Sequence, residues 1–149
     1  MALFFEWTDE LSVGIQEIDE QHKVLIELLN ELHDAIRQRH GSEASVQILG
    51  RLADYTRTHF TVEESLMRIL GYPDYDAHKQ HHEDLINQMN ELQLRLSAGE
   101  AVTFELMHFL RHWLTNHIME GDKRYTEYFL SCGAQEKWHK KSWLERFWA

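Results

Sequence analysis

Histidine and carboxylate side chains recur at helical spacing in this sequence. His59 and Glu63 lie four residues apart, and so do His78 and His82, so each pair points in nearly the same direction from one face of a helix. Such side chains are costly to bury unless another group pairs with them or a metal ion binds them. If both pairs face one interior, they predict a metal site.

Three further residues extend this set. His22 lies on an apolar stripe, His117 follows Leu110 and Leu114 at helical spacing, and Asp122 comes five residues after His117. Taken singly, each feature is ordinary, because a lone histidine among leucines is usually a hydrogen-bonded core residue. Five histidines and two carboxylates converging from four helices instead indicate bound metal. The candidate ligands are His22, His59, Glu63, His78, His82, His117 and Asp122.

The donor set limits the metal. Seven donors exceed the four positions of a tetrahedral zinc site. Histidine with carboxylate suits iron or manganese, and the ligand types alone leave that choice open. Two six-coordinate ions have twelve positions, of which five imidazoles, two bridging carboxylates and a bridging oxide or hydroxide fill eleven. The remaining position is open to a small ligand.

Four helices would bring these residues together. Apolar residues three or four apart predict helices from Asp19 to about Arg39, from after Ser42 to about Leu70, from Asp74 to about Leu96, and from Thr103 to about Leu130. Asp19 is the predicted cap of the first helix. Short turns join the helices, so we expect an all-α, up-down-up-down four-helix bundle.

The remaining segments complete one predicted domain, residues 1–149. Residues 1–18 are expected to form an N-terminal arm, residues 19–130 the four-helix bundle, and residues 131–149 a C-terminal tail with a short helix. The tail is rich in tryptophan and lysine. We expect it to fold back over the bundle; the alternative is that it docks on a protein partner or a membrane surface.

One spacing conflicts with an ideal helix. Residues five apart on an α-helix lie about 140° apart, so Asp122 would not share a face with His117. A local bulge near Gly121, or an aspartate side chain that reaches round, would bring them together. Bulges of the π type are frequent at functional sites.

Composition narrows the partners. The net charge of −10 disfavours nucleic acid, whose phosphates would be repelled. No stretch approaches the ~20 apolar residues of a transmembrane helix. The single cysteine, Cys132, suits a reducing compartment, and the N-terminus lacks the basic lead of a signal peptide. We therefore expect a cytoplasmic protein.

With these residues in view, the sequence resembles a bacterial hemerythrin. The matching segments are "QHK" at His22, "HFTVEE" from His59 to Glu64, "GYPDYDAHKQHH" with His78 and His82, and "WLTNHIMEGDKRY" from Trp113 to Tyr125. Their order and spacing agree from residue 1 to about residue 130. The resemblance implies a non-haem di-iron centre that binds O₂ reversibly, in a protein that transports, stores or buffers oxygen and is not an enzyme.

The resemblance also implies a role for each ligand. One iron would be held by His78, His82 and His117 and the other by His22 and His59, with Glu63 and Asp122 as bridges. The iron with two histidines would keep the position for O₂.

Other residues receive roles from the same resemblance. Trp113 and Leu114 match residues that line the oxygen pocket, and Tyr125 matches an aromatic that lies behind the ligands or packs near them. Glu64 is expected to face solvent. The other histidines are expected at the surface or behind the ligands, and they are His33, His40, His81, His108, His112 and His139.

Two other classes of function are open to such a site. An open di-iron centre can act as an oxidase or peroxidase or react with nitric oxide, although no further acid, base or substrate pocket is legible. An oxygen-sensing or redox-sensing module is the other alternative, with the tail as its contact. A ferritin-like site is excluded, because the ExxH pairs Glu105–His108 and Glu136–His139 do not converge with the other ligands.

Overall fold

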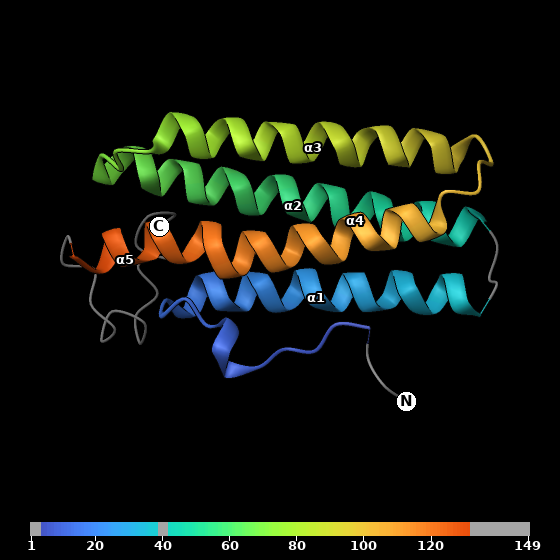
Figure 1. Ribbon diagram of the computed structural model, residues 1–149, viewed down its shortest axis with the longest axis horizontal. Helices are drawn as coiled ribbons and strands as arrows, with labels where there is room; N and C mark the ends of the chain where they lie inside the picture. The colour runs from blue at the N-terminus through green and yellow to red at the C-terminus, as the bar shows by residue number, and fades with distance from the viewer. Residues whose placement is uncertain (1–3, 39–41, 132–149) are drawn as a thin grey trace.

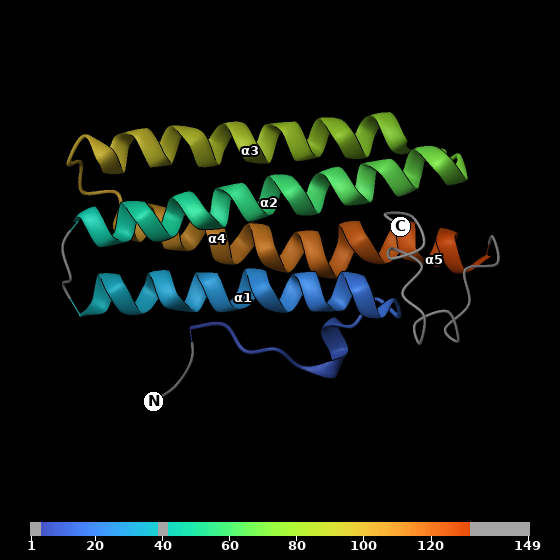
Figure 2. The ribbon, with the colours of Figure 1, turned by 180° about the vertical axis from the view of Figure 1, so that it is seen from behind.

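Four long helices lie side by side along the whole length of the molecule (Figure 1). The computed structural model describes residues 4–38 and 42–131. Its long helices are α1 (Gln16–Arg37), α2 (Ser42–Leu70), α3 (Tyr75–Ser97) and α4 (Thr103–Asn116). Successive helices run in opposite directions, which confirms the predicted all-α, up-down-up-down bundle (Figures 1 and 2).

The fourth helix has three consecutive parts. After α4 comes a π-helical segment, η2 (His117–Asp122), and then α5 (Lys123–Ser131) continues in the same direction. A short 3-10 turn, η1 (Asp9–Leu11), lies in the N-terminal arm. No helix within residues 4–38 and 42–131 is long and apolar enough to cross a membrane.

The first helix begins earlier than predicted. Ile15, in an extended conformation, precedes α1, so Asp19 lies in the first turn and does not cap the helix. The Asp19 carboxylate instead accepts hydrogen bonds from the Val13 backbone N–H at 2.9 Å and the Ser12 hydroxyl at 2.6 Å. Asp19 therefore fastens the arm to α1.

A Schellman motif ends α2 at the predicted glycine. Gly71 adopts a left-handed conformation with φ of +65°. Its N–H donates to the Arg68 carbonyl at 3.3 Å, and the Tyr72 N–H donates to the Met67 carbonyl at 2.8 Å. This turn buries Tyr72 and directs the chain back into α3.

The apolar core is divided into two clusters. The larger includes Leu25, Phe60, Leu85 and Leu114, and the smaller includes Ile18, Val62, Tyr72, Tyr125 and Phe129. On every long helix, the candidate metal ligands fall in the sequence between residues of these two clusters or next to one of them. The fold thus places its polar centre where the apolar core is interrupted.

The predicted tail, residues 131–149, lies outside the described residues except for Ser131, which ends α5. Cys132, His40 and His139 also lie outside them.

Candidate metal centre

Five imidazoles and two carboxylates meet inside the bundle. Helix α1 contributes His22, α2 contributes His59 and Glu63, α3 contributes His78 and His82, and η2 contributes His117 and Asp122. His78 is 9% exposed and the other six are at most 2% exposed. The structure therefore brings together all seven residues that the sequence suggested as ligands.

The π-helical segment resolves the conflict in spacing. His117 begins η2 and Asp122 ends it, and the wider turn puts both side chains on the interior side. His117 Nε2 lies 3.0 Å from Asp122 Oδ2. The predicted bulge is present.

One carboxylate oxygen of Asp122 is surrounded by imidazole nitrogens. The distances from Oδ2 to the Nε2 atoms of His22, His117 and His59 are 2.5, 3.0 and 3.3 Å. The Nε2 atoms of His59 and His117 also face each other at 3.1 Å. Hydrogen bonds alone satisfy such crowding poorly, because each imidazole nitrogen either donates one proton or accepts one.

Glu63 lies across the same space. Its Oε1 is 3.3 Å from His82 Nε2 and 3.6 Å from His117 Nε2, and its Oε2 is 3.3 Å from His59 Nε2. Among the described residues, neither Glu63 oxygen has a hydrogen-bond partner of normal geometry, and the same is true of the buried Nε2 atoms of His78 and His82. Buried polar atoms without partners are rare, and a bound cation would satisfy them together. These residues therefore fit a metal centre.

The donor atoms form two groups that share both carboxylates. Within each group the ligand atoms lie within 4.8 Å of one another. The first group is His22, His59, Glu63, His117 and Asp122, and the second is Glu63, His78, His82 and Asp122. Two overlapping groups with shared carboxylates suit two bridged metal ions.

His117 is placed differently from what the resemblance implies. It joins the group of His22 and His59, whereas the resemblance assigns it to the iron of His78 and His82. The centroid of its ring is 5.2 Å from that of His59 and 5.3 Å from that of His82. His117 therefore stands between the two groups.

Burial and nearby charges shift the pKa values of two neighbouring imidazoles, His117 and His59, in opposite directions. Burial lowers the pKa of His117 to about 4. Burial also acts to lower the pKa of His59, but the negative charges of Glu63 and Asp122, together with the hydrogen bond to Asp122, outweigh it and raise this pKa to about 10. Without metal, His59 thus holds a proton for the carboxylates. A metal ion binds only the neutral imidazole, so metal binding would displace this proton from His59.

Two hydrogen bonds from outside the ligand set orient the imidazoles. His59 Nδ1 lies 2.6 Å from Gln21 Oε1, and His82 Nδ1 lies 2.8 Å from Glu64 Oε2. Because a carboxylate only accepts, Nδ1 of His82 carries the proton and its Nε2 lone pair faces the interior. Glu64 was expected to face solvent rather than to bind metal; its side chain is 20% exposed, so it is partly open to solvent, and its carboxylate also contacts His82.

Aromatic rings support the centre from the larger core cluster. Phe60 stacks on His82 with ring centroids 3.6 Å apart, and Trp113 stacks on His117 at 5.9 Å. Leu114 is fully buried beside Trp113. Phe60 was not singled out by the sequence, because a phenylalanine on an apolar stripe resembles any core residue.

Tyr125 lies on the other side of the centre, in the smaller cluster. Its ring centroid is 5.8 Å from that of His78. Its buried hydroxyl finds no hydrogen-bond partner of normal geometry within residues 4–38 and 42–131. Burial, and then the charges of Glu63 and Asp122, raise the pKa of Tyr125 well above its usual value, so the hydroxyl stays protonated.

Comparison with known proteins decides the family. Residues 13–129 match the model of the Hemerythrin HHE cation binding domain. The chain belongs to the hemerythrin family. It is 44% identical over 121 residues to the bacteriohemerythrin of Pseudomonas aeruginosa (strain PAO1), which covers 81% of this chain and 78% of that relative. It is 39% identical over 126 residues to the bacteriohemerythrin of Methylococcus capsulatus (strain Bath), with 84% and 95% covered.

Solved structures of hemerythrins share the fold. A wild-type hemerythrin superposes with a TM-score of 0.76 at 36% identity, over 83% of this chain and 96% of that one. A point mutant of a hemerythrin gives a TM-score of 0.78 at 34% identity, over 85% and 97%. Family, bundle and buried cluster together support a non-haem iron protein that binds O₂.

Proposed function

We propose that this protein binds O₂ reversibly at a di-iron centre and thereby carries, stores or buffers oxygen in the cytoplasm. The observation that carries the proposal is the pair of donor groups that share Glu63 and Asp122. Two ions so bridged can together supply two electrons to a bound O₂ and recover them when it leaves. All seven converging residues would serve as ligands, and the choice of iron follows the family.

The protein residues would make this exchange reversible by controlling protons and water. Trp113 and Leu114 are 3% and 0% exposed, Trp113 stacks on His117, and the two side chains would form an apolar wall beside the centre. Such a wall would exclude the water and protons that promote irreversible oxidation of the centre. On the opposite side, the Tyr125 hydroxyl stays protonated and adds no charge.

Spectroscopy of the iron-loaded protein tests the proposal. The ferrous protein is prepared without oxygen, its iron is quantified, and its visible spectrum is recorded as air is admitted and then removed under argon. Two irons per chain and a coloured band that appears and fades over repeated cycles are expected. The zinc-loaded protein serves as a control and should remain colourless. One irreversible change to a ferric spectrum would contradict the proposal and favour an oxidase or peroxidase.

A further inference from the structure

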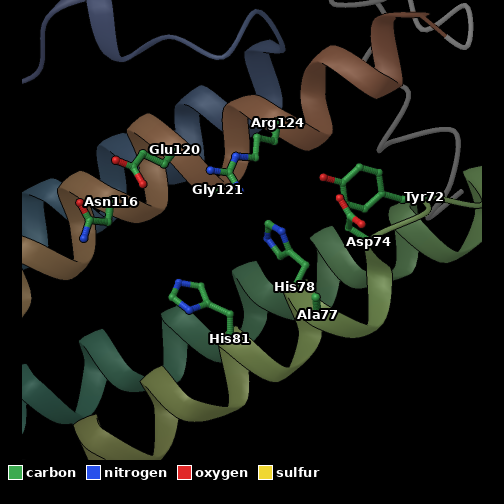
Figure 3. Close-up of a pocket in the computed structure, with 9 residues that line it drawn as sticks. All are labelled: Tyr72, Asp74, Ala77, His78, His81, Asn116, Glu120, Gly121 and Arg124. Atoms are coloured by element: carbon green, nitrogen blue, oxygen red, sulfur yellow. The ribbon is translucent and has the colours of Figure 1, made fainter.

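The centre approaches the surface at one of its seven residues. His78 is 9% exposed, whereas the other six are at most 2% exposed. Outside His78 lies a pocket of about 310 Å³ between α3 and the η2–α5 part of the fourth helix (Figure 3). His78 extends from α3 into this pocket. The imidazole of His78 thus forms the wall between the pocket and the buried donors.

The side chains at the mouth of the pocket are of the types that bind metal. Asp74 and His81 belong to one wall, Glu120 to the opposite wall, and all three are exposed. Carboxylate and imidazole suit divalent iron. Arg124 also lines the pocket and is the one residue with a fixed positive charge among the described residues that line it.

A second pocket also borders a ligand, but an aromatic ring closes it. It is lined by Phe60, Glu64 and His82, among others. Phe60 lies flat on the His82 ring, with centroids 3.6 Å apart and planes 1° apart, and His82 is only 2% exposed. An ion in this second pocket would therefore meet a phenyl ring before it met a donor atom of the centre.

Among the described residues, no ring lies flat on His78: Tyr72 and Tyr125 meet it edge-on, with centroids 6.3 and 5.8 Å away. A Cβ atom at position 121 would lie 3.6 Å from His78 Cε1, in ordinary contact. Glycine leaves that space open, while alanine would fill it without a clash. The gap beside His78 can therefore be narrowed by a single methyl group.

We propose that this pocket is the route by which Fe²⁺ enters the centre, with Asp74, Glu120 and His81 attracting the ion and His78 receiving it. The proposal rests on the proposed function, because it assumes that the centre binds iron. Among the described residues, the mouth side chains do not gather into a third group of closely spaced donors. Loose spacing suits a passage, since tight binding at the mouth would hold the ion there.

The rate of iron uptake tests the route independently of oxygen binding. The metal-free full-length protein is mixed with Fe²⁺ under argon, and excess ferrous chelator is added at intervals to trap the iron that is not yet protected. The variant Asp74→Asn/Glu120→Gln is expected to load about fivefold more slowly, because the mouth no longer concentrates the cation. Its final iron content should equal that of the wild type. Arg124→Gln is expected to load faster.

A charge-matched variant separates the pocket from the general surface charge. Glu83→Gln/Glu91→Gln removes the same two negative charges from exposed positions of α3 outside this pocket and should load at the wild-type rate. Equal loading by wild type and the mouth variant, or equal slowing in both double variants, would overturn the proposal.

The substitution Gly121→Ala tests the passage without altering charge. It is expected to slow both iron uptake and iron removal by the chelator, because the methyl group narrows the gap beside His78. Unchanged rates in both directions would contradict the route. If the wild-type protein takes up two irons yet shows no reversible band with O₂, the proposed function fails and the route stands. If every variant loads iron at the wild-type rate and the wild-type protein shows the reversible band, the route alone fails.

Discussion

His117 and Asp122 face each other at 3.0 Å from the two ends of one π-helical segment. An uninterrupted α-helix would turn Asp122 away from the interior by about 140° relative to His117. Because the π-helical turn contains one extra residue, the side chains of both His117 and Asp122 point into the metal centre. This turn also sets the rotation of α5, which carries Tyr125 and Phe129 into the smaller core cluster.

Inserting one alanine after Glu120 should abolish the centre. The added residue would rotate Asp122 and α5 by about 100° relative to His117, moving Tyr125 and Phe129 out of the core. We expect fewer than half of the wild-type metal ions per chain and a lower Tm, measured by metal analysis and circular dichroism. Glu120→Ala keeps the register and should retain full metal content at equilibrium. Full metal content in the insertion variant would mean that the rotation set by the π-helical turn is dispensable.

Substituting a predicted ligand should reduce the metal content, whereas substituting His81, which is next to a ligand in the sequence, should not. Glu63→Ala removes a carboxylate shared by both donor groups, so we expect at most one ion per chain after dialysis. His22→Ala should also lower the content. His81→Ala, on the exposed side of α3, should keep about two. Equal loss from His81→Ala would show that the wrong member of the His81–His82 pair has been chosen.

Glu64 should contribute to metal affinity without touching the metal. Its carboxylate fixes the His82 ring through Nδ1 at 2.8 Å, and loss of such partners typically costs about 10–100-fold in metal affinity. We expect Glu64→Ala to weaken binding by about that factor in competition with a chelator. Glu83→Ala, an exposed acid on α3, should leave the affinity unchanged. Equal affinities for Glu64→Ala and the wild type would contradict this role.

Leu114 should protect the oxygen complex as well as the core. Leu114→Ala and Leu110→Ala each remove a fully buried leucine from α4, and each should lower the free energy of unfolding by about 2–5 kcal/mol. Only Leu114 belongs to the proposed wall of the oxygen site. We therefore expect faster irreversible oxidation in Leu114→Ala, followed by visible absorption, and a near wild-type rate in Leu110→Ala. Similar acceleration in both variants would attribute the effect to lost stability.

The metal-free protein should be most stable near pH 6.5. Below that pH the unfolded chain protonates His117, whose folded pKa is about 4, so stability falls as the pH drops from 6.5 towards 4. Above pH 6.5 the folded state retains the proton of His59, whose folded pKa is about 10, so stability falls as the pH rises towards 10. Each proton contributes a slope of about 1.4 kcal/mol per pH unit.

Urea denaturation at pH 5, 6.5 and 9 checks this dependence. The iron-loaded protein, handled without oxygen, should lose the alkaline decline, because the metal takes the place of the proton on His59. A metal-free protein that is equally stable at pH 6.5 and pH 9 would show that His59 is not protonated in the folded state.

Hydrophobic periodicity was enough to predict the helices and their inward faces. It placed His59 with Glu63 and His78 with His82, because helical spacing alone fixes those relationships. It misplaced the start of α1, because Asp19 has the chemistry of a cap but binds the arm from inside the first turn.

The contacts behind the ligands were not predictable in this way. Gln21 and Glu64 each lie next in the sequence to a candidate ligand, and each contacts a histidine of another helix. Such contacts depend on the distance and rotation between helices, which one sequence does not encode as a local pattern. The position of His117 between the two donor groups depends on the same packing.

The contact between His22 and Asp122 joins residues 100 positions apart in the chain. An ion held by both would act as a reversible cross-link across almost the whole bundle. Cross-links over long loops lower the entropy of the unfolded chain more than short ones do, although only logarithmically with loop length. The same ion would then serve both oxygen binding and the stability of the fold. The difference in unfolding free energy between the iron-loaded and metal-free proteins at pH 6.5 measures its contribution to stability.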